Sequence, residues 1–176
     1  MRIITGQFKG RHFEIPRSFK ARPTTDFAKE NIFNVLNGYI DLENAVALDL
    51  FSGTGSISLE LVSRGCSQVI SIEMDRDHHR FICDCLKKLD TKTCIPLRAD
   101  VFRFLKSCHQ QFNFIFADPP YALKELPQIP DLVFEKNLLS KGGIFVFEHG
   151  NDHDFAAHPH FVEHRSYGSV NFSIFK

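Results

Sequence analysis

The sequence predicts an α/β fold in which a mostly parallel sheet is covered by helices on both faces. Between residues 45 and 147, short apolar runs alternate with segments whose apolar residues recur at helical spacing, a pattern typical of repeated strand–helix units. The run over residues 45–50 is almost entirely apolar, as expected for a strand that is buried on both faces. Two further strand-like runs, at 161–165 and 170–175, flank a turn at Tyr167 and Gly168, which predicts an antiparallel C-terminal hairpin completing a seven-stranded sheet.

The remaining elements follow from local patterns. Residues 2–4 and 12–15 flank a turn-rich stretch with Gly6 and Gly10, which predicts an N-terminal β-hairpin. A helix is predicted from Thr25 to about Tyr39. The strand at 93–97 contains Pro96 and is expected at a sheet edge, because proline cannot donate a ladder hydrogen bond. Further strands are predicted over 45–50, 68–73, 112–117 and 144–147, with helices over 56–64, 75–89, 101–108 and 129–139.

The composition indicates a globular protein of one domain. The chain has 176 residues, of which 43% are hydrophobic and 24% are charged. We expect residues 1–40 to form a basic hairpin-and-helix extension and residues 41–176 to form the catalytic core. No apolar run approaches the roughly 20 residues of a membrane span. Five cysteines without a CxxC pair suit free thiols in a reducing compartment, so a cytoplasmic location without membrane association is expected.

Charge is unevenly distributed along the chain, although the formal net charge is +0. Residues 1–30 hold three acidic side chains and seven basic ones, which are Arg2, Lys9, Arg11, Arg17, Lys20, Arg22 and Lys29. Such an arm could bind nucleic-acid phosphates, and a solvated loop is the alternative.

A glycine-rich loop follows the first strand of the alternating region. Its glycines would let the backbone approach a ligand closely, next to the free N–H groups of a helix start. A nicotinamide-binding loop would have a third glycine where this chain has Ser58. An acid at the strand end suits a cationic ligand such as S-adenosylmethionine better than a pyrophosphate. The candidate cofactor-binding residues here are Asp49, Phe51, Ser52, Gly53, Thr54 and Gly55.

Acidic residues also end the next two strands. Glu73 could accept hydrogen bonds from two ribose hydroxyls, with solvent exposure as the alternative. Asp100 could accept from an adenine amino group, although capping of the following helix is an equally simple role. Met74 and Val101, their neighbours in sequence, are added to the predicted cofactor site.

The segment from Asp118 to Tyr121, with sequence Asp-Pro-Pro-Tyr, is the most specific signal. Prolines lack a backbone N–H, so this loop mainly presents hydrogen-bond acceptors. Asp118 and the Pro119 carbonyl could accept both hydrogens of an amino group and direct its lone pair at a methyl donor. Tyr121 could stack on the target base. A strand end with a packed tyrosine is the alternative reading of these three candidate catalytic residues. No metal site is expected, because the His149 and His153 pair lies in a loop.

With these residues in place, the chain resembles the bacterial small-subunit ribosomal RNA guanine-N2-methyltransferases of the RsmD type. The resemblance rests on 2–6 with Gly10 and Arg11, on 22–26 with Glu30, Phe33 and Asn34, and on 49–55, 72–75 and 118–121. It implies a Rossmann-like class I methyltransferase fold, S-adenosylmethionine as methyl donor, and a guanine of 16S rRNA as target, free or within an assembling small ribosomal subunit. No obligate protein partner is implied.

The resemblance also assigns roles to residues of the arm. Thr24 and Thr25 would lie near the cofactor or the entering base. Phosphate contacts would come from Arg2, Lys9, Arg11, Arg17, Lys20 and Arg22.

Three alternatives remain at this point. An N6-adenine DNA methyltransferase could use the same loop, but it usually carries additional sequence for reading the major groove. The second is a non-catalytic RNA-binding protein that retains the fold. A nicotinamide-dependent oxidoreductase is the most remote.

Overall fold

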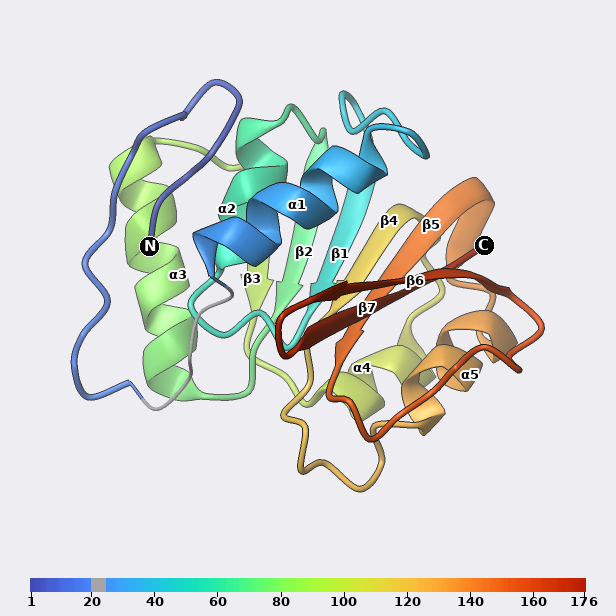
Figure 1. The fold of residues 1–176 in the computed structure, drawn as a ribbon. Helices are drawn as coiled ribbons and strands as arrows, with labels where there is room; N and C mark the ends of the chain where they lie inside the picture. The colour runs from blue at the N-terminus through green and yellow to red at the C-terminus, as the bar shows by residue number, and fades with distance from the viewer. Residues whose placement is uncertain (20–24) are drawn as a thin grey trace.

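The sheet has parallel strands at one side and an antiparallel pair at the other. The computed structural model describes residues 1–19 and 25–176, and within them seven strands pair in the order β3-β2-β1-β4-β5-β7-β6 (Figure 1). β1 to β5 are mutually parallel, and β7 is antiparallel to both β5 and β6. The strands are β1 (Val46–Leu50), β2 (Gln68–Ile72), β3 (Cys94–Leu97), β4 (Phe112–Ala117), β5 (Leu139–His149), β6 (Phe161–Tyr167) and β7 (Val170–Phe175). The predicted sheet, its edge strand at Pro96 and its closing hairpin are confirmed.

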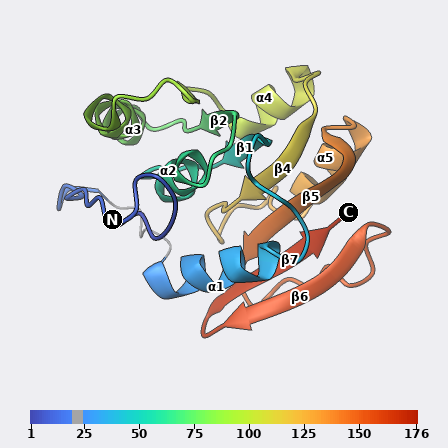
Figure 2. The same ribbon diagram turned by 90° about the horizontal axis from the view of Figure 1, so that it is seen from above.

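Helices cover both faces of this sheet, as the alternating pattern predicts. α1 (Asp26–Leu36), α2 (Ser56–Ser63) and α3 (Arg76–Leu89) lie on one face, and α4 (Val101–Ser107) and α5 (Gln128–Glu135) lie on the other (Figure 2). Each face has its own hydrophobic cluster. Seven phenylalanines from β4, β5 and β7 are essentially inaccessible to solvent. Burial of these rings supplies much of the apolar area that stabilises the fold.

Side-chain caps fix where three of the helices begin. Thr25 Oγ1 accepts a hydrogen bond from the Ala28 amide at 3.2 Å. Asp75, the predicted cap of α3, accepts from the amides two and three residues further along the chain. Asp100 accepts from the Arg103 amide at 2.9 Å. Each cap satisfies N–H groups that have no partner within the helix.

Several predicted boundaries are wrong by a few residues. α1 ends at Leu36, so Tyr39 lies beyond it, and α5 ends at Glu135 rather than at residue 139. Asn137 has a φ of +52°, which breaks the helix, and the apolar residues after it open β5 instead. β5 continues to His149, two residues beyond the predicted strand. The closing turn falls after Tyr167, at the next two residues.

The predicted N-terminal hairpin is reduced to one antiparallel bridge, between Arg2 and His12. Three amides still donate across the predicted hairpin, and others donate to α2. The amides of Ile4 and Thr5 donate to the Glu60 carboxylate at 2.8 and 3.0 Å. Gly6 has a φ of +89°, and a Cβ there would lie 1.8 Å from the Ser63 carbonyl oxygen. Only glycine allows this approach, so the short hairpin is also held against α2.

None of the helices formed by the described residues is long and apolar enough to cross a membrane.

Candidate active site

Three acidic side chains gather where β1, β4 and β5 end. Asp49 is opposite Phe116 in the β1–β4 register, two residues before Asp118. Ala117 is opposite Phe147 in the β4–β5 register. Asp118 and Glu148, the next residues along the two segments, therefore lie side by side. The parallel strands bring these carboxyl groups to one edge of the sheet, where α/β proteins bind their ligands.

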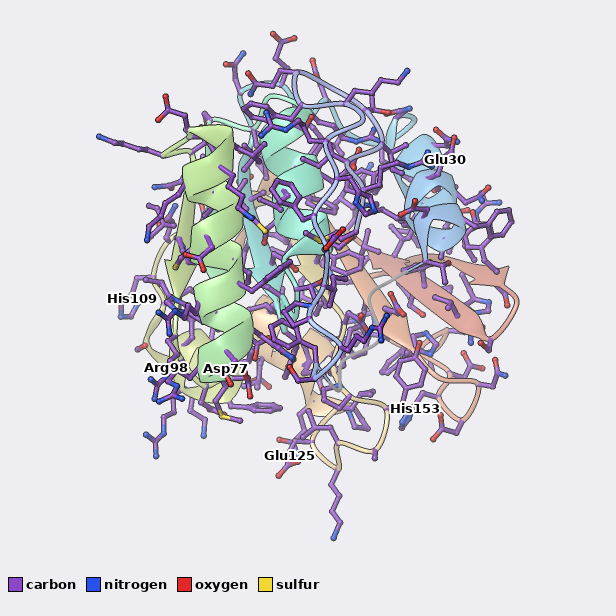
Figure 3. The ribbon with its side chains drawn as sticks, turned by 90° about the vertical axis from the view of Figure 1, so that its left-hand side faces the viewer. Glu30, Asp77, Arg98, His109, Glu125 and His153 are labelled. Carbon is purple, nitrogen blue, oxygen red and sulfur yellow. The ribbon has the colours of Figure 1, made fainter. Side chains whose placement is uncertain are left out.

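Loops following neighbouring strands surround this edge. Figure 3 shows Asp77, Arg98, Glu125 and His153, from the segments after β2, β3, β4 and β5, at the same end of the molecule. Glu30, on α1, lies toward the other end. The rim of the candidate site is therefore formed by loops far apart in sequence.

The glycine loop after β1 presents its backbone to this edge. Gly53 and Gly55 have φ values of +53° and +76°. A Cβ on Gly55 would lie 2.8 Å from Ile82 Cγ1, whereas one on Gly53 would approach nothing closer than 4.0 Å. Gly55 therefore allows the loop to pack on α3, and Gly53 leaves open space for a ligand.

The side chains of Ser52 and Thr54 are used inside the protein. Ser52 Oγ donates to the Asp49 carbonyl at 2.8 Å and accepts from Ser71 Oγ at 2.8 Å. Thr54 is 3% exposed, and its hydroxyl lies 3.6 Å from Met1 Sδ. These two residues can contribute to a cofactor site mainly through their backbone. Phe51, with a φ of +60°, is partly exposed at the start of the loop.

Asp49 is a buried acid with little compensation. It accepts a hydrogen bond from Ser58 Oγ. Loss of hydration raises the pKa of its carboxyl group to about 7, although the hydrogen bond from Ser58 lowers it. A cationic group bound at this edge would stabilise the charged form of Asp49.

Glu73 connects the turns that follow β1 and β2. Its carboxylate accepts from the Gly53 amide at 2.7 Å and from the Asp75 amide at 2.7 Å. Asp100 caps α4, so the alternative role considered for it is present in the structure. Met74 is 66% exposed at the rim, and Val101, the first residue of α4, is buried.

The loop after β4 is attached to both neighbouring strands. The Asp118 amide donates to the Leu50 carbonyl of β1 at 3.3 Å. The Tyr121 hydroxyl donates to Glu148 Oε1 of β5 at 3.0 Å. Pro119, in the same loop, is buried. Loss of hydration, and then the charges of Glu148 and Asp49, raise the pKa of the Asp118 carboxyl group well above its usual range.

Glu148 is a site residue that the sequence reasoning missed. It is 4% exposed and lies directly after the predicted strand at 144–147. The rule that selected Asp49, Glu73 and Asp118, an acid at the carboxyl end of a predicted strand, would have selected it as well.

The basic arm follows α3 from one end to the other (Figure 1). Arg11 donates to the Lys88 carbonyl at 3.0 Å, in the last turn of α3. The Phe19 ring lies 4.5 Å from the His78 ring, in the first turn of the same helix. Arg17, exposed and two residues before Phe19, is therefore close to the candidate site, whereas Arg11 is at the far end.

The other predicted arm residues have different surroundings. Arg2 forms an ion pair with Asp26 at 3.2 Å, and Lys9 is exposed. Thr25 caps α1. Lys20, Arg22 and Thr24 lie outside the described residues.

Counting Lys29 as part of the exposed basic arm was wrong. It is fully buried, and its Nζ donates to the Arg2 carbonyl at 2.6 Å and to Ser56 Oγ at 3.0 Å. It lies on the inner side of α1 with Ile32 and Phe33, where no phosphate can reach it.

The histidines near the carboxyl end have protein partners. His149 is buried and hydrogen-bonds to Ser173 Oγ at 2.8 Å. His160 stacks on Phe134 with 3.9 Å between ring centroids. In the part of the chain that the structure describes, no three His, Cys, Asp or Glu side chains are grouped as a metal ion would need.

The whole chain matches a known family. The family model "Conserved hypothetical protein 95" covers residues 1–176. "Ribosomal RNA small subunit methyltransferase D" of Haemophilus influenzae is 34% identical, over 86% of this chain and 80% of the relative. The chain belongs to the ribosomal RNA small subunit methyltransferase D family. "Putative rRNA methyltransferase YlbH" of Bacillus subtilis is 35% identical, over 86% of this chain and 84% of the relative.

A solved structure of the family has the same fold. "Putative methyltransferase yhhF" of Escherichia coli superposes with a TM-score of 0.88 at 27% identity, covering 99% of this chain and 96% of the other. Family and fold confirm the predicted class, the class I S-adenosylmethionine-dependent methyltransferases. The residues present fit that cofactor, because Asp49 is a buried acid that joins none of the ion pairs between described residues, and Gly53 leaves open space in the loop after β1.

Proposed function

We propose that the chain transfers the methyl group of S-adenosylmethionine to the exocyclic N2 amine of a guanine in 16S rRNA. The observation that carries this proposal is the position of the Asp118-to-Tyr121 loop. It follows β4, between the glycine loop of β1 and the acid at the end of β5. A base amine held there would face the cofactor loop directly.

Residues of β1 and β2 would hold the cofactor, which supplies an electrophilic methyl group on a sulfonium. Asp49 would stabilise its positive charge, and the Gly53 backbone would leave room for it. Glu73 would accept from the ribose hydroxyls, which requires it to exchange the amide hydrogen bonds that it now accepts from Gly53 and Asp75. Met74 and Val101 would border the adenine.

Asp118 and the Pro119 carbonyl would bind the target amine. An aryl amine is a weak nucleophile because its lone pair is delocalised into the ring, and two acceptors on its hydrogens direct that lone pair toward the methyl group. A nitrogen–carbon bond forms as the carbon–sulfur bond breaks, and the amine must then lose one proton. The raised pKa of Asp118 makes its carboxylate a suitable acceptor for that proton.

The rRNA substrate is supported by the family and by the arm. The H. influenzae relative is named as acting on the RNA of the small ribosomal subunit. Arg17, beside the first turn of α3, is positioned to contact phosphates around a base that has left its stack.

The decisive experiment is a methyl-transfer assay with labelled S-adenosylmethionine. The acceptors are unmethylated 16S rRNA, naked and in small subunits, and the product nucleoside is identified. We expect N2-methylguanosine at a single position. Labelled N6-methyladenosine, or label in DNA only, would overturn the guanine assignment. Cofactor binding without any transfer to rRNA would favour the non-catalytic alternative.

A further inference from the structure

Glu148 has one carboxyl oxygen in use and one without a partner. Oε1 accepts the hydrogen bond from Tyr121, whereas Oε2 is buried and has no hydrogen-bond partner among residues 1–19 and 25–176. Buried acceptors in folded proteins are nearly always satisfied. An unpaired oxygen at the end of a central strand therefore indicates a donor that arrives with a ligand.

Glu148 has no ion-pair partner in the part of the chain that the structure describes. None of the ion pairs between described residues includes Glu148, Asp118 or Asp49. Loss of hydration raises the pKa of Glu148 to about 7. Both observations describe a carboxyl group that has one donor, Tyr121, and would gain stability from a second donor at Oε2.

The bases differ in what adjoins their amino group. Guanine has an N1–H donor next to its N2 amine, whereas adenine has an N1 acceptor next to its N6 amine. An acceptor placed beside the group that binds the amine would bond to guanine and repel adenine. Glu148 lies beside Asp118 in the register of the two adjacent strands. Its Oε2 is therefore near Asp118, the proposed acceptor of the amine.

We propose that Glu148 is the specificity-determining residue of the site, and that its Oε2 accepts the N1–H of guanine while Asp118 binds the N2 amine. This inference rests on the proposed function. Oε2 is shielded from solvent in the free protein, so we infer that the base reaches it when the loop carrying Tyr121, which bonds to Oε1, shifts. That loop, residues 118–127, contains neither helix nor strand, and its movement leaves the sheet intact.

The test compares two acceptors that carry the same reacting amine. Once the methylated position is known, 16S rRNA is prepared with either guanine or 2-aminopurine there. The analogue keeps the amine but has an unprotonated N1 and lacks the O6 oxygen. We expect the natural protein to prefer guanine by about a hundredfold or more in kcat/KM, because an analogue that leaves a buried polar group unpaired is strongly rejected.

Two variants distinguish this role from a structural one. Glu148→Gln can turn an amide N–H toward the unprotonated N1, so its preference for guanine should fall to about tenfold or less. Tyr121→Phe removes the bond to Oε1 and leaves Oε2 in place, so activity falls but the preference remains. The ratio of kcat/KM on the two acceptors, measured with one preparation of a variant, does not depend on the fraction of the protein that is folded.

Several outcomes would overturn the inference. Equal losses on both acceptors in Glu148→Gln, with the preference unchanged, would make Glu148 a structural residue. If that variant transfers no methyl group at all, the relative affinity for the two RNAs is measured in the presence of S-adenosylhomocysteine. An undiminished preference in that binding assay would also contradict the role. Absence of N2-methylguanosine with the natural protein would instead mean that the proposed function fails.

Discussion

Two groups of buried and half-buried charged residues are built in different ways. The arm cluster consists of Lys29, Glu60 and Arg64. Glu60 accepts two backbone amides of the arm and Arg64 Nε at 2.9 Å, and Lys29 Nζ lies 3.8 Å from its other oxygen. Two cations surround one anion, and both Glu60 oxygens have donors. Such an arrangement holds the arm and α1 against α2.

The acidic cluster consists of Asp49, Asp118 and Glu148. Its members have one sign of charge, they take part in none of the ion pairs among the described residues, and one Glu148 oxygen has no donor. Loss of hydration and the neighbouring carboxylates together raise the pKa of Asp118. The comparison teaches that burial alone does not mark a functional site. An uncompensated set of buried charges does, because its missing partners must come from outside.

The largest effect is expected from removing the amine acceptor. Asp118→Ala should lower turnover by about a thousandfold, the upper range for losing one preorganised transition-state contact. S-adenosylmethionine affinity should stay within about threefold, because the glycine loop and Glu73 are unchanged. Turnover is measured by label transfer, and affinity by calorimetry. Glu125→Ala, an exposed acid in the same loop (Figure 3), is the matched control. Equal losses of turnover and affinity would contradict the assigned role.

Removing the lysine of the arm cluster should affect stability. Lys29→Met leaves the Arg2 carbonyl and Ser56 Oγ without their buried donor. Each such group costs about 1–3 kcal/mol, so we expect a loss of about 2–6 kcal/mol in the free energy of unfolding. Urea denaturation measures this. Lys9→Met, at an exposed lysine of the arm, should change little. A loss below about 1 kcal/mol in Lys29→Met would mean that the cluster is not needed to hold the arm.

The acidic cluster should show the opposite behaviour, because it opposes folding. The pKa of Asp49 rises from 3.8 in the unfolded chain to about 7 in the folded protein. The folded state therefore binds the proton more tightly, and stability falls as pH rises from about 4 to about 7. Asp49→Asn should be more stable than the natural protein at pH 8, by at most about 4 kcal/mol, with the difference fading near pH 4. Thermal unfolding of both proteins across this range tests the sign. A variant that is less stable at pH 8 would refute it.

The two clusters also show what a sequence can and cannot predict. Asp49, Glu73 and Asp118 were selected as strand-end acids, and the structure has them at strand ends. Glu148 was missed although it follows the same rule. Lys29 was misread because charge counting ignores helical phase. It lies three and four residues before the buried Ile32 and Phe33, so the helical period indicated an inward-facing lysine. Which acids remain uncompensated depends on contacts between distant segments, and local pattern does not contain that information.

The smallest effect is expected from the exposed arm, where solvent screens each charge. Arg17 and Arg11 give a matched pair, since they lie near opposite ends of α3. His78 and Lys88 are ten positions apart in α3, which corresponds to about 15 Å of helix. Arg17→Glu should weaken 16S rRNA binding by about tenfold at low salt and reduce the slope of log K against log salt by about one. Arg11→Glu, far from the acidic cluster, should stay within about threefold. Filter binding at several salt concentrations separates the two. Equal effects would mean that RNA follows the whole arm, and no effect from Arg17→Glu would leave the RNA-binding surface to other residues.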